Sequence, residues 1–353
     1  MKPVIAWAAG LLSVAGILGG LSAQAEAALL VTNTRGDNVV AFDEISGRYL
    51  GEFISPINGL EEPDTLLYGP DGNLYISSGK TPETSAIYRF DGKTGQFIDK
   101  FASGGGLFRP YGIAFGPDNK LYVSSFLTDQ ILRYDGSTGA FIDVFAAGDG
   151  LDPNGLNGPN GLLFGPDGNL YVTTQGSVAV NGVPQFKFES IILKYDIKTG
   201  QKSVYANQPK PSPDSFGFVS FLGLAIGPED GDLYVSDFAN DIRRYDFETG
   251  TLLEALPTNY TGTSPSSNFV GALAFGPNND LFTVGFDFNA GNVGSILKFD
   301  SKTGKRSSFV ANNKDLKRPI GILFAPAVKV PEPGAIAGLV LVGTMFLGTR
   351  GKP

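Results

Sequence analysis

The side chains that most often perform catalysis are missing from this sequence. Its 353 residues include no histidine and no cysteine. This excludes serine–histidine triads, histidine- or thiolate-bound metals and cysteine nucleophiles. What remains is oxygen and guanidinium chemistry, in which carboxylates and amides bind a hard cation and arginines bind an anion. The net charge of −8 disfavours nucleic acid as a partner.

Two oxygen donors fall at corresponding places in a sequence repeat. Asp64 precedes one repeat unit, and Asn160 lies in Pro159-Asn160-Gly161 two units later. Carboxylate and amide oxygens of this kind are the ligands that a hard cation such as calcium prefers. Calcium takes about six to eight oxygens, so these two side chains would need help from loop carbonyls. The alternative is that both residues simply cap turns.

Two arginines share another phase of the repeat. Arg109 and Arg318 each stand directly before a proline, and Tyr111 follows the first of them. We predict that Arg109, Tyr111 and Arg318 bind a ligand, because paired arginines suit a carboxylate or an acidic sugar. The alternative is salt bridging to nearby acids.

The elements that position these residues come from two repeated motifs. The first is an apolar pair, Gly-Pro, an Asp/Asn/Gly turn and Leu-aromatic, with its glycine at residues 69, 116, 165, 227 and 276. The second is an aromatic residue and aspartate closed by Thr/Ser-Gly, and its aspartates are residues 43, 91, 135, 196, 246 and 300. Both motifs predict tight hairpins, in which aspartate caps the turn and glycine takes a positive φ.

Spacings of 47, 49, 62 and 49 residues between the Gly-Pro motifs are typical of four-stranded β-propeller blades. The first aromatic-Asp motif has no Gly-Pro before it, and the final echo of Gly-Pro, at residues 324–326, has no aromatic-Asp after it. One blade is therefore split between strand 320–324 and strands within 29–53. The sequence predicts an all-β, six-bladed propeller whose ring is closed by N- and C-terminal strands sharing one blade.

In such a ring, the residues just before each innermost strand line one mouth of the central channel. Here they are Asp64, Tyr111, Asn160, Leu222, Val270 and Ile320. The segments Asp237–Asp246 and Arg35–Asp43 resemble NHL-type repeats, and the chain over about 29–326 is similar to six-bladed propellers of the gluconolactonase and senescence-marker group. Members of that group hold a divalent ion at this mouth, and Pro159-Asn160-Gly161 resembles the segment that carries their asparagine ligand. The resemblance therefore implies that Asn160, with Asp64 as a second oxygen donor, binds a metal ion, and calcium is the ion we predict. The resemblance implies fold more than activity.

Two insertions lengthen the third repeat, at residues 175–189 and 207–220. Long loops on rigid scaffolds often carry function, although neutral length variation is an equal alternative. Their phenylalanines would form a contact patch or pack onto the blade; they are Phe186, Phe188, Phe216 and Phe218.

The two ends read as targeting signals, which leaves residues 28–328 for the propeller. Residues 1–27 have a basic start, an apolar stretch and small residues at Ala23-Gln24-Ala25 and Ala25-Glu26-Ala27, as in a secretory signal peptide; an uncleaved anchor is the alternative. Residues 329–353 contain Pro331-Glu332-Pro333, an apolar run and a basic end. This segment resembles a PEP-CTERM sorting signal with a short transmembrane helix, and a plain tail anchor is the alternative.

The resemblance to PEP-CTERM proteins implies a bacterial chain, processing by an exosortase, transient inner-membrane anchoring and a final place at the cell surface or in the matrix. We therefore expect an exported, non-enzymatic binding or structural propeller, with exopolysaccharide or a surface protein as partner. The alternative is a calcium-dependent lactonase or hydrolase of the gluconolactonase-like type. No cofactor other than calcium is indicated.

Overall fold

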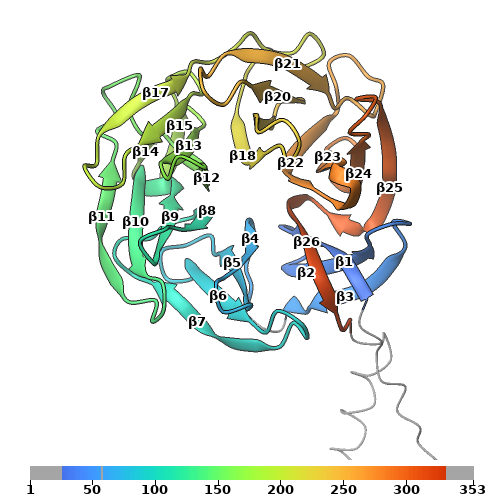
Figure 1. Ribbon diagram of the computed structural model, residues 1–353, viewed down its shortest axis with the longest axis horizontal. Coiled ribbons are helices and arrows are strands. Elements are labelled where there is room, and N and C mark those ends of the chain that lie inside the picture. Colours follow the sequence, from blue (N-terminus) through green and yellow to red (C-terminus); the bar gives the residue numbers. More distant parts are fainter. Residues whose placement is uncertain (1–25, 57–58, 331–353) are drawn as a thin grey trace, which may run out of the picture.

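The computed structural model describes residues 26–56 and 59–330. These residues form six four-stranded antiparallel sheets, arranged in a ring around a central axis, together with one two-stranded hairpin (Figure 1). The predicted all-β, six-bladed propeller is confirmed. The helical elements include two 3-10 turns, η2 (Phe126–Thr128) and η3 (Pro277–Asn279).

Five blades are continuous in sequence, and each runs from the axis outwards. Blade 1 contains β4 (Leu66–Tyr68), β5 (Leu74–Ser78), β6 (Ala86–Phe90) and β7 (Phe97–Ser103). Blade 2 contains β8 (Pro110–Phe115), β9 (Lys120–Ser125), β10 (Gln130–Asp135) and β11 (Phe141–Ala147). Blade 3 contains β12 (Pro159–Phe164), β13 (Leu170–Thr174), β16 (Ile192–Tyr195) and β17 (Lys202–Ala206).

Blade 4 contains β18 (Phe221–Ile226), β19 (Leu233–Asp237), β20 (Asp241–Tyr245) and β21 (Leu252–Pro257). Blade 5 contains β22 (Asn268–Phe275), β23 (Leu281–Asp287), β24 (Val293–Phe299) and β25 (Arg306–Lys317). The separate hairpin consists of β14 (Ser177–Val180) and β15 (Val183–Phe186), and it interrupts blade 3.

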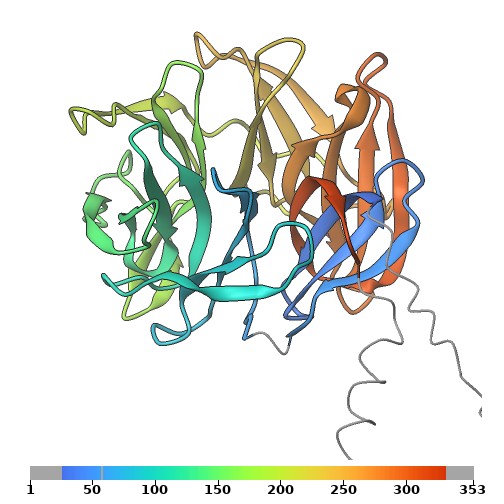
Figure 2. The same ribbon diagram turned by 60° about the horizontal axis from the view of Figure 1, so that its bottom comes forward.

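The sixth blade is the split one. Its innermost strand is β26 (Pro319–Val328), which pairs with β1 (Glu26–Asn33), and β2 (Asn38–Asp43) and β3 (Tyr49–Ile54) complete it. Leu30 lies opposite Leu323 in this register, and Glu26 lies opposite Val328. Figures 1 and 2 show the first and last strands of the ring side by side. Strand β1 thus begins two residues before residue 28.

The repeated motifs form the turns that their composition predicts. In blade 2, the Asp135 carboxylate accepts hydrogen bonds from the backbone N–H groups of Ser137 and Thr138, at 3.0 and 2.8 Å, and Gly139 has a φ of 71°. In the Gly-Pro motif, the Tyr122 hydroxyl donates to Asp118 at 3.1 Å. Each aromatic ring at this position also packs between blades, so one residue type secures both the turn and the core.

Small hydroxyl side chains join neighbouring blades near the axis. Thr173 of blade 3 accepts a hydrogen bond from Gly161 N–H at 2.8 Å and donates to the Leu222 carbonyl of blade 4 at 2.5 Å. The same donation joins other blade pairs: Thr32 to Asp64, Ser77 to Tyr111, and Ser124 to Asn160. The blades approach so closely that a Cβ on Gly161 would lie 2.2 Å from the Leu222 oxygen.

Within the described residues, no helix has the length and apolar character needed to cross a membrane. The apolar stretch of the predicted signal peptide and the predicted sorting motif Pro331-Glu332-Pro333, with its transmembrane segment, lie outside those residues. The leader, the sorting signal and their boundaries therefore stay predictions from sequence.

Candidate functional site

A cavity of about 660 Å³ opens at one mouth of the central channel. This face carries the loops that enter each innermost strand and the loops between the second and third strands of each blade. Five of the six predicted mouth positions line the cavity, namely Asp64, Tyr111, Asn160, Leu222 and Ile320. Arg109 and Arg318 line it as well. The topology therefore gathers all five predicted site residues in one place.

The expectation for the sixth mouth position, Val270, is wrong. Val270 is fully buried and is not among the residues that line the cavity. Its N–H donates a hydrogen bond to the Phe238 carbonyl at 3.2 Å, and the Phe238 side chain lines the cavity there. A residue from the loop between β19 and β20 of the preceding blade thus takes the place that the repeat assigned to the innermost strand.

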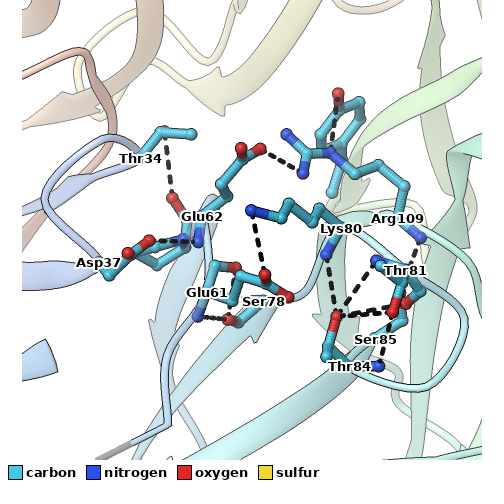
Figure 3. Close-up of polar contacts among 12 residues, drawn as sticks. Thr34, Asp37, Glu61, Glu62, Ser78, Lys80, Thr81, Thr84, Ser85 and Arg109 are labelled. Atoms are coloured by element: carbon cyan, nitrogen blue, oxygen red, sulfur yellow. Dashed lines mark hydrogen bonds and ion pairs between the residues drawn. The ribbon is translucent and has the colours of Figure 1, made fainter. Parts of the chain in front are cut away.

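Arg109, which directly precedes blade 2, is held by two residues from the loops of blade 1, Ser85 and Glu62 (Figure 3). Its N–H donates to the Ser85 hydroxyl at 3.0 Å, and its guanidinium forms an ion pair with Glu62. The guanidinium also lies 5.5 Å from the centre of the Tyr111 ring and donates to the Tyr111 hydroxyl at 3.4 Å. Burial opposes the charge, but Tyr111 and Glu62 hold the pKa of Arg109 above its ordinary value. The predicted alternative of salt bridging holds for Arg109.

Asp64 is a buried carboxylic acid with few partners. Its main chain is fixed, because Asp64 N–H donates to the Ser77 carbonyl at 3.0 Å and Thr32 donates to the Asp64 carbonyl. Its carboxylate receives one long contact, from the Thr65 hydroxyl at 3.5 Å. Burial raises the pKa of Asp64 to about 6, and the positive charges of Arg109 and Arg318 offset this only in part. At neutral pH the cavity therefore holds a carboxyl group close to its titration point.

Arg318 differs from Arg109 in its surroundings. Its guanidinium lies 5.6 Å from the centre of the Phe286 ring. Among the described residues, no carboxylate lies within ion-pairing distance of it, and no side-chain hydrogen bond is formed. Both arginines adopt a left-handed backbone conformation before their prolines, with φ of 57° for Arg109 and 53° for Arg318. This strained geometry is costly for a non-glycine residue, and both loops bend in the same way at the mouth.

In contrast to these polar residues, part of the cavity wall is apolar and consists of phenylalanines. Phe238 stacks on Phe269, with ring centres 4.3 Å apart and ring planes at 16°. Phe269 in turn stacks on Phe288, and Phe216 and Phe218 of the 207–220 insertion pack against this group. We call the six residues of this group the aromatic wall; they are Phe216, Phe218, Phe238, Phe269, Phe286 and Phe288. Phe218 and Phe238 line the cavity directly.

The other insertion contributes the hairpin β14–β15. A single buried carboxylate holds it, because Asp129 accepts from Gly158 N–H at 2.8 Å and from Ala179 N–H at 2.7 Å. Phe186 and Phe188 of this insertion line the cavity, and Phe186 is 68% exposed. Phe186, Phe188 and Phe218, which come from the two insertions, thus border one cavity. Phe216 and Phe218 of the 207–220 insertion also pack against Phe269 of blade 5.

The metal prediction for Asp64 and Asn160 remains a prediction. Both residues line the cavity, and no side-chain hydrogen bond of Asn160 is formed within the described residues. That part of the chain brings together no group of three or more acidic side chains able to hold a metal ion. Arg109 and Arg318 also place positive charge beside Asp64, which opposes a cation and favours an anion.

A second buried charge cluster anchors the 207–220 insertion. Arg243 pairs with Asp237 at 3.1 Å and with Asp241 at 3.0 Å, and it donates to the Lys210 carbonyl at 3.0 Å. Asp237 also accepts from Ser220 N–H at 2.8 Å. Burial raises the pKa of Asp241 to about 7, with the nearby charge of Asp237 acting in the same direction and Arg243 opposing it. The loop that carries Phe216 and Phe218 is thus held at both ends by this cluster.

The fold defines the chain as a six-bladed β-propeller, and comparisons with known proteins agree. No family model matches the chain, and no curated protein matches its sequence significantly. Among solved structures, it is similar to a chain of the nidogen/laminin complex, with 15% identity and a TM-score of 0.57, over 86% of this chain and 99% of that one.

Two similar structures are enzymes by name. One is virginiamycin B lyase from Staphylococcus aureus with quinupristin, with 16% identity and a TM-score of 0.51, over 84% of this chain and 87% of that one. The other is a putative gluconolactonase, with 16% identity and a TM-score of 0.50, over 75% of this chain and 86% of that one. At these identities the likeness shows the fold alone. The predicted similarity to NHL-type and gluconolactonase-like propellers is therefore confirmed for the fold alone.

Proposed function

We propose that this protein is an exported β-propeller that acts as a non-enzymatic binding module, with its ligand site in the cavity at the channel mouth. The observation that supports this most directly is the cavity itself. Its volume of about 660 Å³ falls within the range of small-molecule sites. Like such sites, it combines apolar walls with a few polar groups, here Asp64, Asn160 and Arg318.

Binding without catalysis is favoured by the chemistry of the lining. The chain has no histidine or cysteine, so a hydroxyl nucleophile would need a carboxylate or an amine as its base. The hydroxyl groups of the inner strands are instead committed to bonds between blades, as for Ser124 and Thr173. The carboxyl group of Asp64 lines the cavity, and its one hydrogen-bond partner within the described residues is the Thr65 hydroxyl, which is 3.5 Å away and does not line the cavity.

The calcium-dependent lactonase remains the second candidate, because the oxygen-bearing side chains of Asp64 and Asn160 line the same cavity. The two proposals are separated by measuring melting temperature in calcium and in chelator, together with turnover of a panel of lactones and esters. We expect no calcium shift and no turnover above buffer. Turnover that requires calcium and is lost in both Asp64→Ala and Asn160→Ala would establish the enzyme instead.

A ligand screen by thermal shift tests the binding site. We expect compounds that raise the melting temperature of the wild type to fail with Phe218→Ala. Phe141→Ala is the matched control, because Phe141 is 41% exposed, as Phe218 is 39% exposed, but lies on the outer strand β11. If a compound that raises the melting temperature of the wild type fails equally with both variants, the cavity is rejected as its binding site.

Export and sorting form the other half of the proposal, and they rest on the sequence signals at the two ends. Cells that express the full chain should hold it at the surface or in the matrix, shortened at its C-terminus near Pro331-Glu332-Pro333. Replacing these three residues with alanine should leave an unshortened chain in the membrane fraction. A wild-type chain that stays in the cytoplasm would contradict export.

A further inference from the structure

We propose that the cavity binds a small molecule with one carboxylate attached to a flat aromatic body, the carboxylate on Arg318 and the body on Phe218 and Phe238. This inference rests on the proposed function, because it takes the mouth cavity as a ligand site and adds the class of ligand. It is carried by the position, at the edge of the aromatic wall, of an arginine that has no carboxylate partner among the described residues.

The cation is Arg318. The cavity holds two arginines, but Arg109 is already paired with Glu62. Arg318 has no such carboxylate partner within the described residues, although it is only partly exposed. Its guanidinium carries five N–H donors in a planar fork, and in the part of the chain that the structure describes it contacts the Phe286 ring and forms no side-chain hydrogen bond. A ligand carboxylate is the group that this fork binds best, through two parallel hydrogen bonds.

The aromatic body is indicated by the continuity of the wall beside this cation. The Phe286 ring under Arg318 lies 6.1 Å from the ring of Phe238, which faces the cavity. Phe218 extends this surface and is 39% exposed. A flat ring placed on Phe218 and Phe238 would cover apolar area that now faces solvent, and ring–ring contacts add to the gain from burial. The carboxylate of such a ring would then reach the guanidinium at the wall's edge.

Asp64 decides which charge state the site accepts. The groups that face it are Arg109, Arg318, Glu62 and Tyr111. An ionised Asp64 would repel an incoming carboxylate, whereas a protonated Asp64 has an O–H to donate to it. Because the pKa of Asp64 is already raised to about 6, a bound anion would raise it further, and binding would take up a proton. The affinity should therefore fall as pH rises from about 5.5 to 8.

The test is isothermal titration of the purified protein with biphenyl-4-carboxylate and naphthalene-2-carboxylate, with their primary amides as uncharged controls and glucuronate as a carboxylate without an aromatic body. We expect the arylcarboxylates to bind about tenfold or more tightly than the amides and than glucuronate. Arg318→Gln should lose about tenfold in affinity. Arg35→Gln should not, because Arg35 is an exposed arginine of a neighbouring loop that does not line the cavity.

A second measurement tests whether ligand binding is accompanied by proton uptake at Asp64. In buffers of different ionisation enthalpy, the wild type should take up a proton on binding near pH 7, and Asp64→Asn should bind without this uptake. The inference is overturned if the amides bind as tightly as the acids, if Arg318→Gln binds like the wild type, if glucuronate binds as tightly as the arylcarboxylates, or if no arylcarboxylate binds. A neutral compound from the thermal-shift screen that depends on Phe218 would then leave the proposed function standing without this ligand class.

Discussion

Thr173 and Leu222 belong to neighbouring blades, and the hydroxyl of the first donates a 2.5 Å hydrogen bond to the carbonyl of the second. Leu222 also lines the mouth cavity. The contact that joins two blades is therefore also the contact that fixes the position of a cavity residue. The same holds for Ser124 with Asn160 and for Thr32 with Asp64. The backbone of the site is therefore fixed by the hydrogen bonds that join neighbouring blades. We call each such contact between two blades a seam.

Thr173→Val tests the strength of such a seam. Valine keeps the shape of threonine but leaves the Gly161 N–H and the Leu222 carbonyl without this partner. We expect a loss of about 2–4 kcal/mol in the free energy of unfolding, measured by urea denaturation. Thr199→Val is the control, because Thr199 is an exposed turn residue. It should cost less than about 1 kcal/mol, and equal losses in the two variants would reject the role assigned to Thr173.

Gly161→Ala tests the close approach of blades 3 and 4. The added Cβ would lie 2.2 Å from the Leu222 carbonyl oxygen, which belongs to backbone that cannot move aside without opening the seam. We expect a loss of more than about 3 kcal/mol or no folded protein. Gly168→Ala is the control: Gly168 has a φ of 77° but open space around it, and should lose only about 1 kcal/mol. Similar expression and melting temperatures for the two variants would contradict the steric argument.

The buried acids predict how stability changes with pH. The folded-state pKa of Asp241 is about 7, above its ordinary value of 3.8, so between about pH 4 and 7 the folded state binds more protons than the unfolded state. Stability from this group is thus greatest below its unfolded pKa and falls as pH rises through 7. Asp241→Asn should flatten this decline and be more stable than the wild type by about 1 kcal/mol at pH 8.

The matched control is Asp135, because its pKa is shifted in the opposite direction to that of Asp241. Hydrogen bonds from Thr138 and Ser137 lower the pKa of Asp135, so its contribution is present above pH 4 and is lost as pH falls through its lowered folded-state pKa. Asp135→Asn should therefore lose stability at neutral pH and show a smaller loss in acid. Melting curves from pH 3 to 8 measure both variants. If stability declines with rising pH in Asp241→Asn as it does in the wild type, the decline is not caused by Asp241.

The first strand indicates where the predicted signal peptide would be cut. Glu26 lies opposite Val328 and forms a 3.0 Å ion pair with Arg48, so β1 uses the chain from residue 26. Cleavage after Ala25 would keep these contacts, whereas cleavage after Ala27 would remove them. We expect mass spectrometry of the exported protein to give an N-terminus at Glu26. An N-terminus at Ala28 would show that the ring dispenses with the first two residues of this strand.

Much of the architecture was predictable because the repeats encode it locally. Aspartate and glycine at fixed offsets determine the hairpins, and the offset between the two motifs identifies the split blade. The position of the five predicted site residues at one cavity was also predictable, since each stands at a fixed phase of the repeat next to the axis. The repeat failed at Val270, because the Phe238 side chain of the preceding blade lines the cavity there.

The aromatic wall could not be predicted in full. Phe216 and Phe218 were recognised in an insertion, but Phe238, Phe269, Phe286 and Phe288 read as ordinary strand and turn residues. Their contacts link the 207–220 insertion to two blades, and no local pattern records such distances. One signal was missed: a glycine follows the mouth position in five repeats, at residues 112, 161, 223, 271 and 321, and marks where neighbouring backbones come closest.

The split blade makes the two ends of the ring depend on each other. Strand β1 is the first strand of the ring to be synthesised and β26 the last, yet β1 lies between β2 and β26. Until residues 319–328 arrive, β1 has a free edge and blade 5 lacks the innermost strand that packs against β22 and β23. The closed ring therefore exists only for a chain complete to about residue 328, so the fold itself distinguishes a finished molecule from a truncated one.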